Sequence, residues 1–204
     1  IELQPEKFDQ ITWLPRDVAL LKSAFACDGT FIRKRGDALV LGTGGCAVVG
    51  IPETGCFAHA GRDSLLDRRF IHEGKSSRRR PSVVETMLRL SLRSKGRPPH
   101  LSLHSFCEIP EEDYPHPLDH PDYGKKNREL AAYIGRAYGD GIMPEIAGVQ
   151  CLDLSLLINR QAVKLGLPVH TGMYSLPRGG AYAYTTHPDP EKRGVRNLVV
   201  AYRA

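Results

Sequence analysis

Three stretches of the chain carry apolar residues at the spacing of an α-helix, and each has its own start or stop signals. Ser82 and Glu85 form the pattern of a capping box ahead of the first apolar run. Asp153 can cap another run, and Gly139 and Gly166 stand where two of the runs end. We therefore expect helices over residues 83–95, 126–138 and 154–165.

Between these runs lie short stretches that are rich in β-branched residues and bounded by glycine. They predict strands over residues 37–43, 46–51, 55–60, 101–104, 181–185 and 195–202. The turn residues Pro52-Glu53-Thr54 indicate that the second and third of these strands pair as a hairpin. Strands and helices are intermixed without regular alternation, which indicates an α+β fold with a mixed sheet. The length of 204 residues fits a single domain.

Composition and charge narrow the range of partners. Apolar residues make up 41% of the chain, which is enough for a sizeable core. The 28 basic and 23 acidic residues give a net charge of +5, which mildly favours anionic partners.

The basic stretch Gly74–Pro81 contains no aromatic residue, so we interpret it as a solvated loop or a phosphate contact and do not expect nucleic-acid binding. The stretch Ile109–Gly124 is too long for a simple connection, and we expect it to cover a site.

The sequence also bears on the compartment. Apolar runs such as Ala47-Val48-Val49 fall far short of the roughly 20 residues that cross a bilayer. The first residues, Ile1–Lys7, lack the apolar block of a signal peptide. Five cysteines without a Cys-x-x-Cys pair are typical of a reducing compartment. We therefore expect a cytoplasmic protein that does not act at a membrane.

The segment around Cys46 is the strongest candidate for chemistry. Gly44 and Gly45 lead into Cys46, and His59 lies thirteen positions further on, at the end of the predicted return strand. A hairpin of that length brings its open end together, so the imidazole can take the proton of the thiol and leave a nucleophilic thiolate. The two glycines expose backbone N–H groups that can hold an oxyanion. The alternative is a buried small cysteine and a hydrogen-bonded histidine at a strand end.

The order of several motifs resembles the laccase-domain family, the YfiH-type or multicopper polyphenol oxidase-like proteins. Cys46 followed by Ala58-His59-Ala60-Gly61-Arg62 is similar to the family's cysteine and its His-Ala-Gly-Trp-Arg motif. Further similar segments follow in the family's order, namely Leu101–Pro110, Leu152–Gly166, Ala181–Thr186 and Arg193–Asn197. The similarity covers about residues 37–204 and leaves residues 1–36 divergent.

The resemblance implies a single α+β domain of stacked mixed β-sheets flanked by helices. It also implies an enzyme that acts on purine nucleosides by phosphorolysis or deamination, with a cysteine and two histidines that can hold zinc. This chain has no histidine before His59, so the zinc ligands implied here are Cys46, His59 and a substitute, for which His104 is the best candidate. The spacing of His116 and His120 is interrupted by proline and is better explained as a surface loop.

Two further functions stay open. The cytotoxic necrotizing factor deamidases and the chemoreceptor glutamine deamidase resemble this family in their catalytic core, and the Gly-Gly-Cys here is similar to the Ser-Gly-Cys of the toxins. The chain can therefore be a metal-independent protein-glutamine deamidase or a related cysteine hydrolase. It can also be a binding protein that keeps the fold without catalysis. For an enzyme, we expect Gly44, Gly45, Arg62 and Arg178 to contact a substrate, which is a small nucleoside or a protein amide.

Overall fold

The central layer of the protein is a five-stranded mixed sheet. The computed structural model describes residues 12–14, 18–21, 29–32, 38–43, 46–73, 79–92, 99–105, 117–146, 148–173 and 197–202. The strand order of the central sheet is β10-β7-β5-β6-β3, in which β10 runs parallel to β7 and the other neighbours run antiparallel. The strands are β3 (Gly29–Phe31), β5 (Ala47–Ile51), β6 (Cys56–Ala60), β7 (Leu101–Ser105) and β10 (Val169–Met173).

A four-stranded sheet forms the second layer, with the order β1-β2-β4-β11. Strands β2 and β4 are parallel, and both outer pairs are antiparallel. The sheet therefore joins strands from the beginning of the chain to its last described strand. Its members are β1 (Thr12–Leu14), β2 (Val18–Leu21), β4 (Ala38–Thr43) and β11 (Asn197–Tyr202). A separate antiparallel pair consists of β8 (Glu145–Ile146) and β9 (Val149–Gln150).

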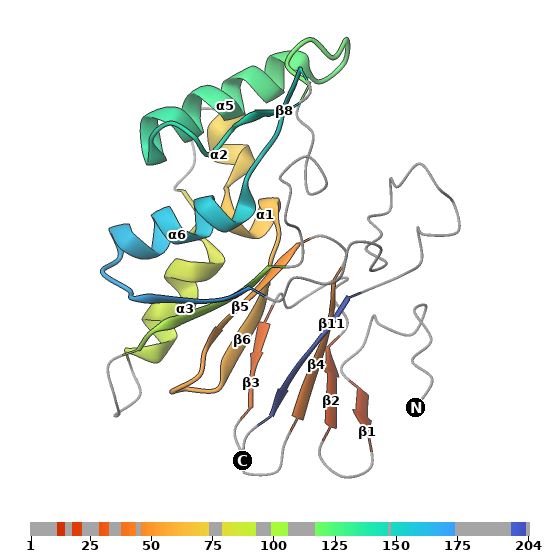
Figure 1. The fold of residues 1–204 in the computed structure, drawn as a ribbon, viewed down its shortest axis with the longest axis vertical. Helices are drawn as coiled ribbons and strands as arrows, with labels where there is room; N and C mark the ends of the chain where they lie inside the picture. The colour runs from red at the N-terminus through yellow and green to blue at the C-terminus, as the bar shows by residue number, and fades with distance from the viewer. Residues whose placement is uncertain are drawn as a thin grey trace.

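Helices form the third layer, on the side of the five-stranded sheet that faces away from the four-stranded sheet (Figure 1). Helix α3 packs on β5 and β6, α6 packs on β7 and β10, and α5 lies farther out on α2 and α6. The helices are α1 (Arg62–Leu65), α2 (Arg68–Glu73), α3 (Val83–Ser91), α5 (Gly124–Tyr138) and α6 (Leu154–Lys164). Two of them begin at the predicted caps. Ser82 and Glu85 form a complete capping box on α3, and the carboxylate of Asp153 accepts the N–H of Leu156 at 2.8 Å.

The alternation of side chains along β5 builds two cores. Ala47, Val49 and Ile51 point into the apolar core under the helices, whereas Val48 belongs to a second cluster between the two sheets. All five residues of β5 are buried, because β5 lies in the middle of the central sheet and is covered on both faces. The predicted α+β fold, a single domain of stacked mixed sheets flanked by helices, is confirmed.

Local signals predicted some elements and missed others. The predicted hairpin over residues 46–60 is present, and so is the last predicted strand, which is described over Asn197–Tyr202. The predicted strand over residues 181–185 lies outside the described residues. Strand β10 was not predicted, because its sequence Val-His-Thr-Gly-Met has no clear alternation and its pairing partner β7 is distant in the chain. Helices α1 and α2 are too short for an apolar period to show.

Candidate functional site

The β5–β6 hairpin positions the two residues that the sequence singled out. At its closed end, the backbone N–H of Thr54 donates to Ile51 O and that of Gly55 donates to Pro52 O, both at 3.1 Å. Gly55 has a φ of 68°, a left-handed conformation that favours glycine. Its carbonyl accepts the N–H of Ile32 at 2.7 Å, which ties the turn to the chain beyond β3. These contacts fix the register of the hairpin.

The register places Cys46 and His59 at the open end. Ala47 pairs with Ala60, and Val48 pairs with His59, so Cys46 stands across from Gly61 just beyond the ladder. Cys46 and His59 are both half-buried. The hydroxyl of Ser64 donates to the carbonyl oxygens of His59 and Gly61, at 3.3 and 2.9 Å, and so holds the turn from β6 into α1.

Gly61 shows how close the two groups lie. A Cβ atom added at Gly61 would lie 3.4 Å from Cys46 Sγ, 2.9 Å from His59 Cε1 and 3.6 Å from His59 Nδ1. The thiol and the imidazole therefore flank one small space that glycine leaves open. The backbone of Gly61 is extended, with φ −85° and ψ 170°, so the space and not the conformation is what excludes a side chain here. Catalytic roles for Cys46 and His59 stay predictions.

His104 lies in the same cross-strand row as His59. Val48 pairs with His59 on one side and with His104 on the other, so the row runs from β6 through β5 to β7. The described residues include the backbone of His104 but not its side chain, and among the described side chains no group of three can hold a metal ion. A thiol and two imidazoles are the donors that zinc prefers, so the chemistry of the predicted set fits zinc.

The other predicted substrate-binding residues divide into two groups. Gly44, Gly45 and Arg178 lie outside the described residues. Arg62 is the first residue of α1 and directly follows Gly61, and its Nε lies 3.4 Å from Asp63 Oδ1. The structure therefore brings Cys46, His59 and Arg62 to one end of the hairpin.

A basic cleft of about 330 Å³ adjoins this end, between α1, α2 and the start of α5. Its described lining contains no acidic side chain, and Arg68 and His72 face it from one side of α2, four residues apart. Pro117, His120 and Tyr123 close the cleft from the segment before α5. The stretch that the sequence predicted to cover a site thus contributes, in its described part, to the wall of this cleft.

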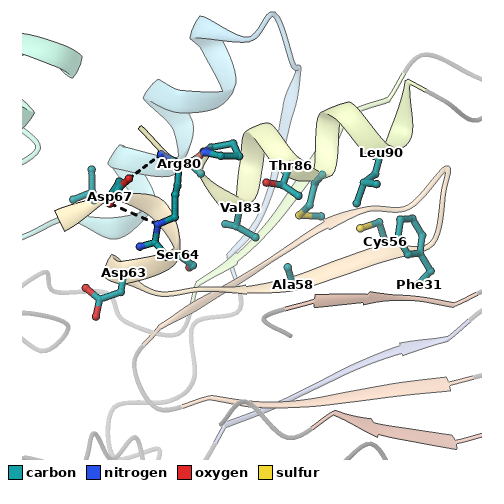
Figure 2. A pocket seen from close by; sticks show the side chains of 14 residues that line it. Phe31, Cys56, Ala58, Asp63, Ser64, Asp67, Arg80, Val83, Thr86 and Leu90 are labelled. Atoms are coloured by element: carbon teal, nitrogen blue, oxygen red, sulfur yellow. Dashed lines mark hydrogen bonds and ion pairs between the residues drawn. The ribbon is translucent and has the colours of Figure 1, made fainter. Parts of the chain in front are cut away.

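A second cavity, of about 380 Å³, lies on the helix side of the central sheet between α3 and β6 (Figure 2). Phe31, Cys56 and Leu90 line one end, and Asp63, Ser64 and the Asp67–Arg80 pair line the other. Cys46 and His59 are not among its described lining residues. This cavity is therefore separate from the candidate Cys–His site.

Asp67 organises the polar end of this second cavity. Its side chain is 5% exposed and accepts the backbone N–H of Arg80 at 2.7 Å and that of Phe70 at 3.3 Å. These hydrogen bonds, first of all the one from Arg80, hold the pKa of Asp67 below its usual 3.8. The charged carboxylate thereby caps α2 and anchors the chain that leads into α3.

In the described part of the basic stretch, both arginines form ion pairs with acidic side chains of the protein. Both terminal nitrogens of Arg79 donate to the carboxylate of Glu85, at 3.0 and 2.6 Å, and Arg80 pairs with Asp67. His120 also makes local contacts, because its Nδ1 accepts the N–H groups of Asp122 and Tyr123. His116 lies outside the described residues.

Comparisons with known proteins assign the chain to no family. No protein-family model, no curated protein and no solved structure matches the chain. Among the described residues, the helices are too short or too polar to span a bilayer.

Proposed function

We propose that the protein is a Cys–His-dependent enzyme similar to the laccase-domain proteins, acting on the carbon–nitrogen bonds of a purine nucleoside. The observation that carries the proposal is the space beside Gly61, which Cys46 Sγ and the imidazole of His59 flank. The two groups come from neighbouring strands whose register is fixed by a closed turn. The arrangement supports the proposal because a nucleophile with an adjacent base needs two such groups side by side.

The pair can carry a complete deamination cycle. His59 takes the proton of Cys46, and the thiolate forms a bond to the carbon that bears the leaving nitrogen. His59 then returns the proton to that nitrogen, the carbon–nitrogen bond breaks, and ammonia leaves. Water, deprotonated by His59, breaks the carbon–sulfur bond and restores the thiol. The cycle consumes one water and releases one ammonia, with no change of oxidation state.

If the enzyme works as the laccase-domain resemblance implies, it would use a zinc ion. Cys46, His59 and His104 would hold the ion, since their donors suit it and two of the three come from one cross-strand row. A zinc ion in such a site lowers the pKa of a bound water and polarises the group under attack. In that form Cys46 and His59 act as ligands.

A metal-independent amide hydrolase is the second candidate. It is favoured by the fact that the two groups beside Gly61 suffice for its chemistry. Its substrate would be a carboxamide such as a glutamine side chain of another protein, and the thiolate would form a thioester before hydrolysis. For either substrate, we expect the enzyme to work in a reducing compartment such as the cytoplasm, where Cys46 stays a thiol.

Ammonia release combined with elemental analysis separates the candidates. The purified chain is incubated with adenosine, with and without phosphate, and separately with a glutamine-rich protein such as casein. Ammonia or free base from adenosine, with about one zinc per chain that is lost in Cys46→Ser and His104→Ala, supports the laccase-domain form. Ammonia from casein alone by metal-free protein supports the amide hydrolase. Activity that survives in Cys46→Ser but falls in Cys151→Ala, a buried cysteine in a different part of the chain, contradicts both.

A further inference from the structure

We infer that the basic cleft between α1, α2 and α5 binds a phosphate group, either inorganic phosphate or the phosphate of a small metabolite. The inference concerns a binding site and does not require the Cys46–His59 reaction. Its starting point is the gathering of three permanent cations, Arg62, Arg68 and Lys126, around one cleft of about 330 Å³.

The described residues that line the cleft are basic or neutral, and the carboxylates that pair with them include those of Asp63 and Glu129. Asp63 lies beside two of the cations, with Oδ1 at 3.4 Å from Arg62 Nε and 3.3 Å from Arg68 Nε. One carboxylate therefore faces two guanidinium groups, and each guanidinium carries five N–H donors. The side chain of Asp63 is 69% exposed, so water weakens its attraction. Glu129 pairs with His72, at 3.1 Å, on the α5 side.

His120 adds a hydrogen-bond donor to the lining. Backbone N–H groups of Asp122 and Tyr123 donate to His120 Nδ1 at 3.1 and 3.2 Å. The ring must accept at Nδ1, so its own proton is assigned to Nε2, which makes His120 a hydrogen-bond donor on its other side. Arginine forks and N–H donors around an open space suit a tetrahedral phosphate, which accepts several hydrogen bonds at once.

The walls of the cleft are held in place before any ligand binds. Asn127 Nδ2 donates to Pro117 O at 2.9 Å, which ties the segment before α5 to the helix. The N–H of Gly124 donates to His120 O at 2.8 Å, and α5 packs along α2. The volume lies at the lower end of the range for small-molecule sites, roughly 300–1,000 Å³, so a small phosphorylated molecule fits better than a macromolecule.

Calorimetric titration of the full chain tests the inference. The probes are inorganic phosphate, ribose 5-phosphate and ribose, at constant ionic strength set with chloride. The variants are Arg68→Gln and Lys126→Gln, which remove cations from the cleft. Arg69→Gln and Lys125→Gln are the matched controls, because each removes the same charge from the adjacent position on the same helix, outside the described cleft lining.

We expect one saturable phosphate site per chain, no ribose binding, and about tenfold weaker binding in Arg68→Gln and Lys126→Gln. The controls should stay within about twofold, since exposed charges are screened. Equal affinity for both phosphate probes would identify inorganic phosphate as the ligand, and tighter ribose 5-phosphate binding would identify a metabolite. Absence of saturable binding, or equal weakening in the controls, would overturn the inference. If circular dichroism shows that Arg68→Gln does not fold, the phosphate affinity of Lys126→Gln tests the inference, because Lys126 is exposed on α5.

Discussion

Gly61 is the residue on which the candidate catalytic pair depends. It directly follows β6, caps the start of α1, and leaves the space that Cys46 and His59 flank. Its backbone is one that any residue adopts, so an added Cβ would disturb the neighbouring side chains and not the backbone conformation. The position therefore allows the geometry of the pair to be changed with little change in the fold.

Gly61→Ala should lower activity while the protein stays folded. The new Cβ would lie 2.9 Å from His59 Cε1 and would push the imidazole away from the thiol. A shift of about 1 Å in a reacting group can lower the rate roughly a hundredfold. The measurement is the rate of ammonia release, together with a thermal unfolding curve.

The control for this substitution is Gly135→Ala on α5. A Cβ there meets only Asp140 Oδ1, at 3.9 Å, which is ordinary contact. This variant should keep full activity and gain stability, by roughly 0.5–1 kcal/mol, because alanine favours a helix interior. Full activity in Gly61→Ala would contradict the proposed role of the Cys46–His59 space.

At the scale of elements, the start of α3 shows how one short motif fixes a helix. Ser82 is 4% exposed, its hydroxyl accepts the N–H of Glu85 at 3.2 Å, and the carboxylate of Glu85 accepts the N–H of Ser82 at 2.6 Å. Glu85 also holds Arg79 through two hydrogen bonds. The helix terminus and the chain before it are thus joined by a single carboxylate.

Ser82→Ala should lower the free energy of unfolding by about 1 kcal/mol, the usual effect of removing an N-cap. The physical reason is that the N–H of Glu85 loses its acceptor in a buried place. Urea unfolding followed by circular dichroism measures the change. Thr86→Ala, at an exposed position of the same helix, is the control and should not destabilise the protein. A loss as large in the control would contradict the role of the cap.

Glu85 should also make stability depend on pH. The hydrogen bonds from Arg79, and then the one from Ser82, lower the pKa of Glu85 in the folded protein below its usual 4.5. A lowered folded-state pKa means that the ionised carboxylate stabilises the protein above the unfolded-state value and that this stability is lost as pH falls through the folded-state value. The difference in free energy of unfolding between the wild type and Glu85→Gln should therefore be largest near neutral pH.

Urea unfolding at a series of pH values between 3 and 7 measures this difference. It should shrink steadily below about pH 4.5. In an Arg79→Gln background, Glu85→Gln should have a smaller effect at neutral pH, since the main partner of the carboxylate is gone. A difference that stays constant with pH would contradict the account of Glu85.

Features that depend on residues close together in the sequence could be predicted, whereas features that depend on contacts between distant segments could not. The capping residues of α3 and α6 act within four positions, so their signals could be recognised. The Cys46–His59 geometry could be predicted as well, because one tight hairpin connects the two residues. The basic cleft could not, since Arg68 and Lys126 come to line the same cleft only through the packing of α2 on α5. The i,i+4 spacing of Arg68 and His72 was the one local signal that pointed to it.

At the scale of the whole molecule, the described buried residues form two cores. The core under the helices contains most of the described buried apolar residues, whereas the core between the sheets rests on Ile32, Leu39, Val48 and Ala201, with Phe57 and Val199 at its margin. Val48 stands directly opposite His59 in the ladder. Among the described side chains, Leu39 of β4 and Ala201 of β11 thus pack against Val48 of β5, close to the candidate site.

Leu39→Ala should loosen the four-stranded sheet. Leu39 is fully buried, and truncating such a leucine removes about 2–5 kcal/mol of stability. Hydrogen exchange with mass spectrometry should show faster exchange in β4 and β11 than in α6. Val163→Ala is the aliphatic control, because Val163 is 70% exposed on α6 and its truncation should change little. Equal protection of β4 and β11 in Leu39→Ala and the wild type would contradict this view of the interface between the sheets.

The rate at which Cys46 is alkylated at pH 7, in wild-type protein and in His59→Gln, tests the central claim most directly. An ordinary thiol is only a few per cent ionised at this pH, so a neighbouring base can raise the rate by about tenfold or more. After dialysis against a chelator, mass spectrometry after iodoacetamide treatment gives the rate for each cysteine. The account predicts that Cys46 reacts faster than the buried Cys56 and Cys151, and that His59→Gln removes about tenfold of that rate. An unchanged rate at Cys46 in His59→Gln, or slower labelling of Cys46 than of Cys151, would contradict it.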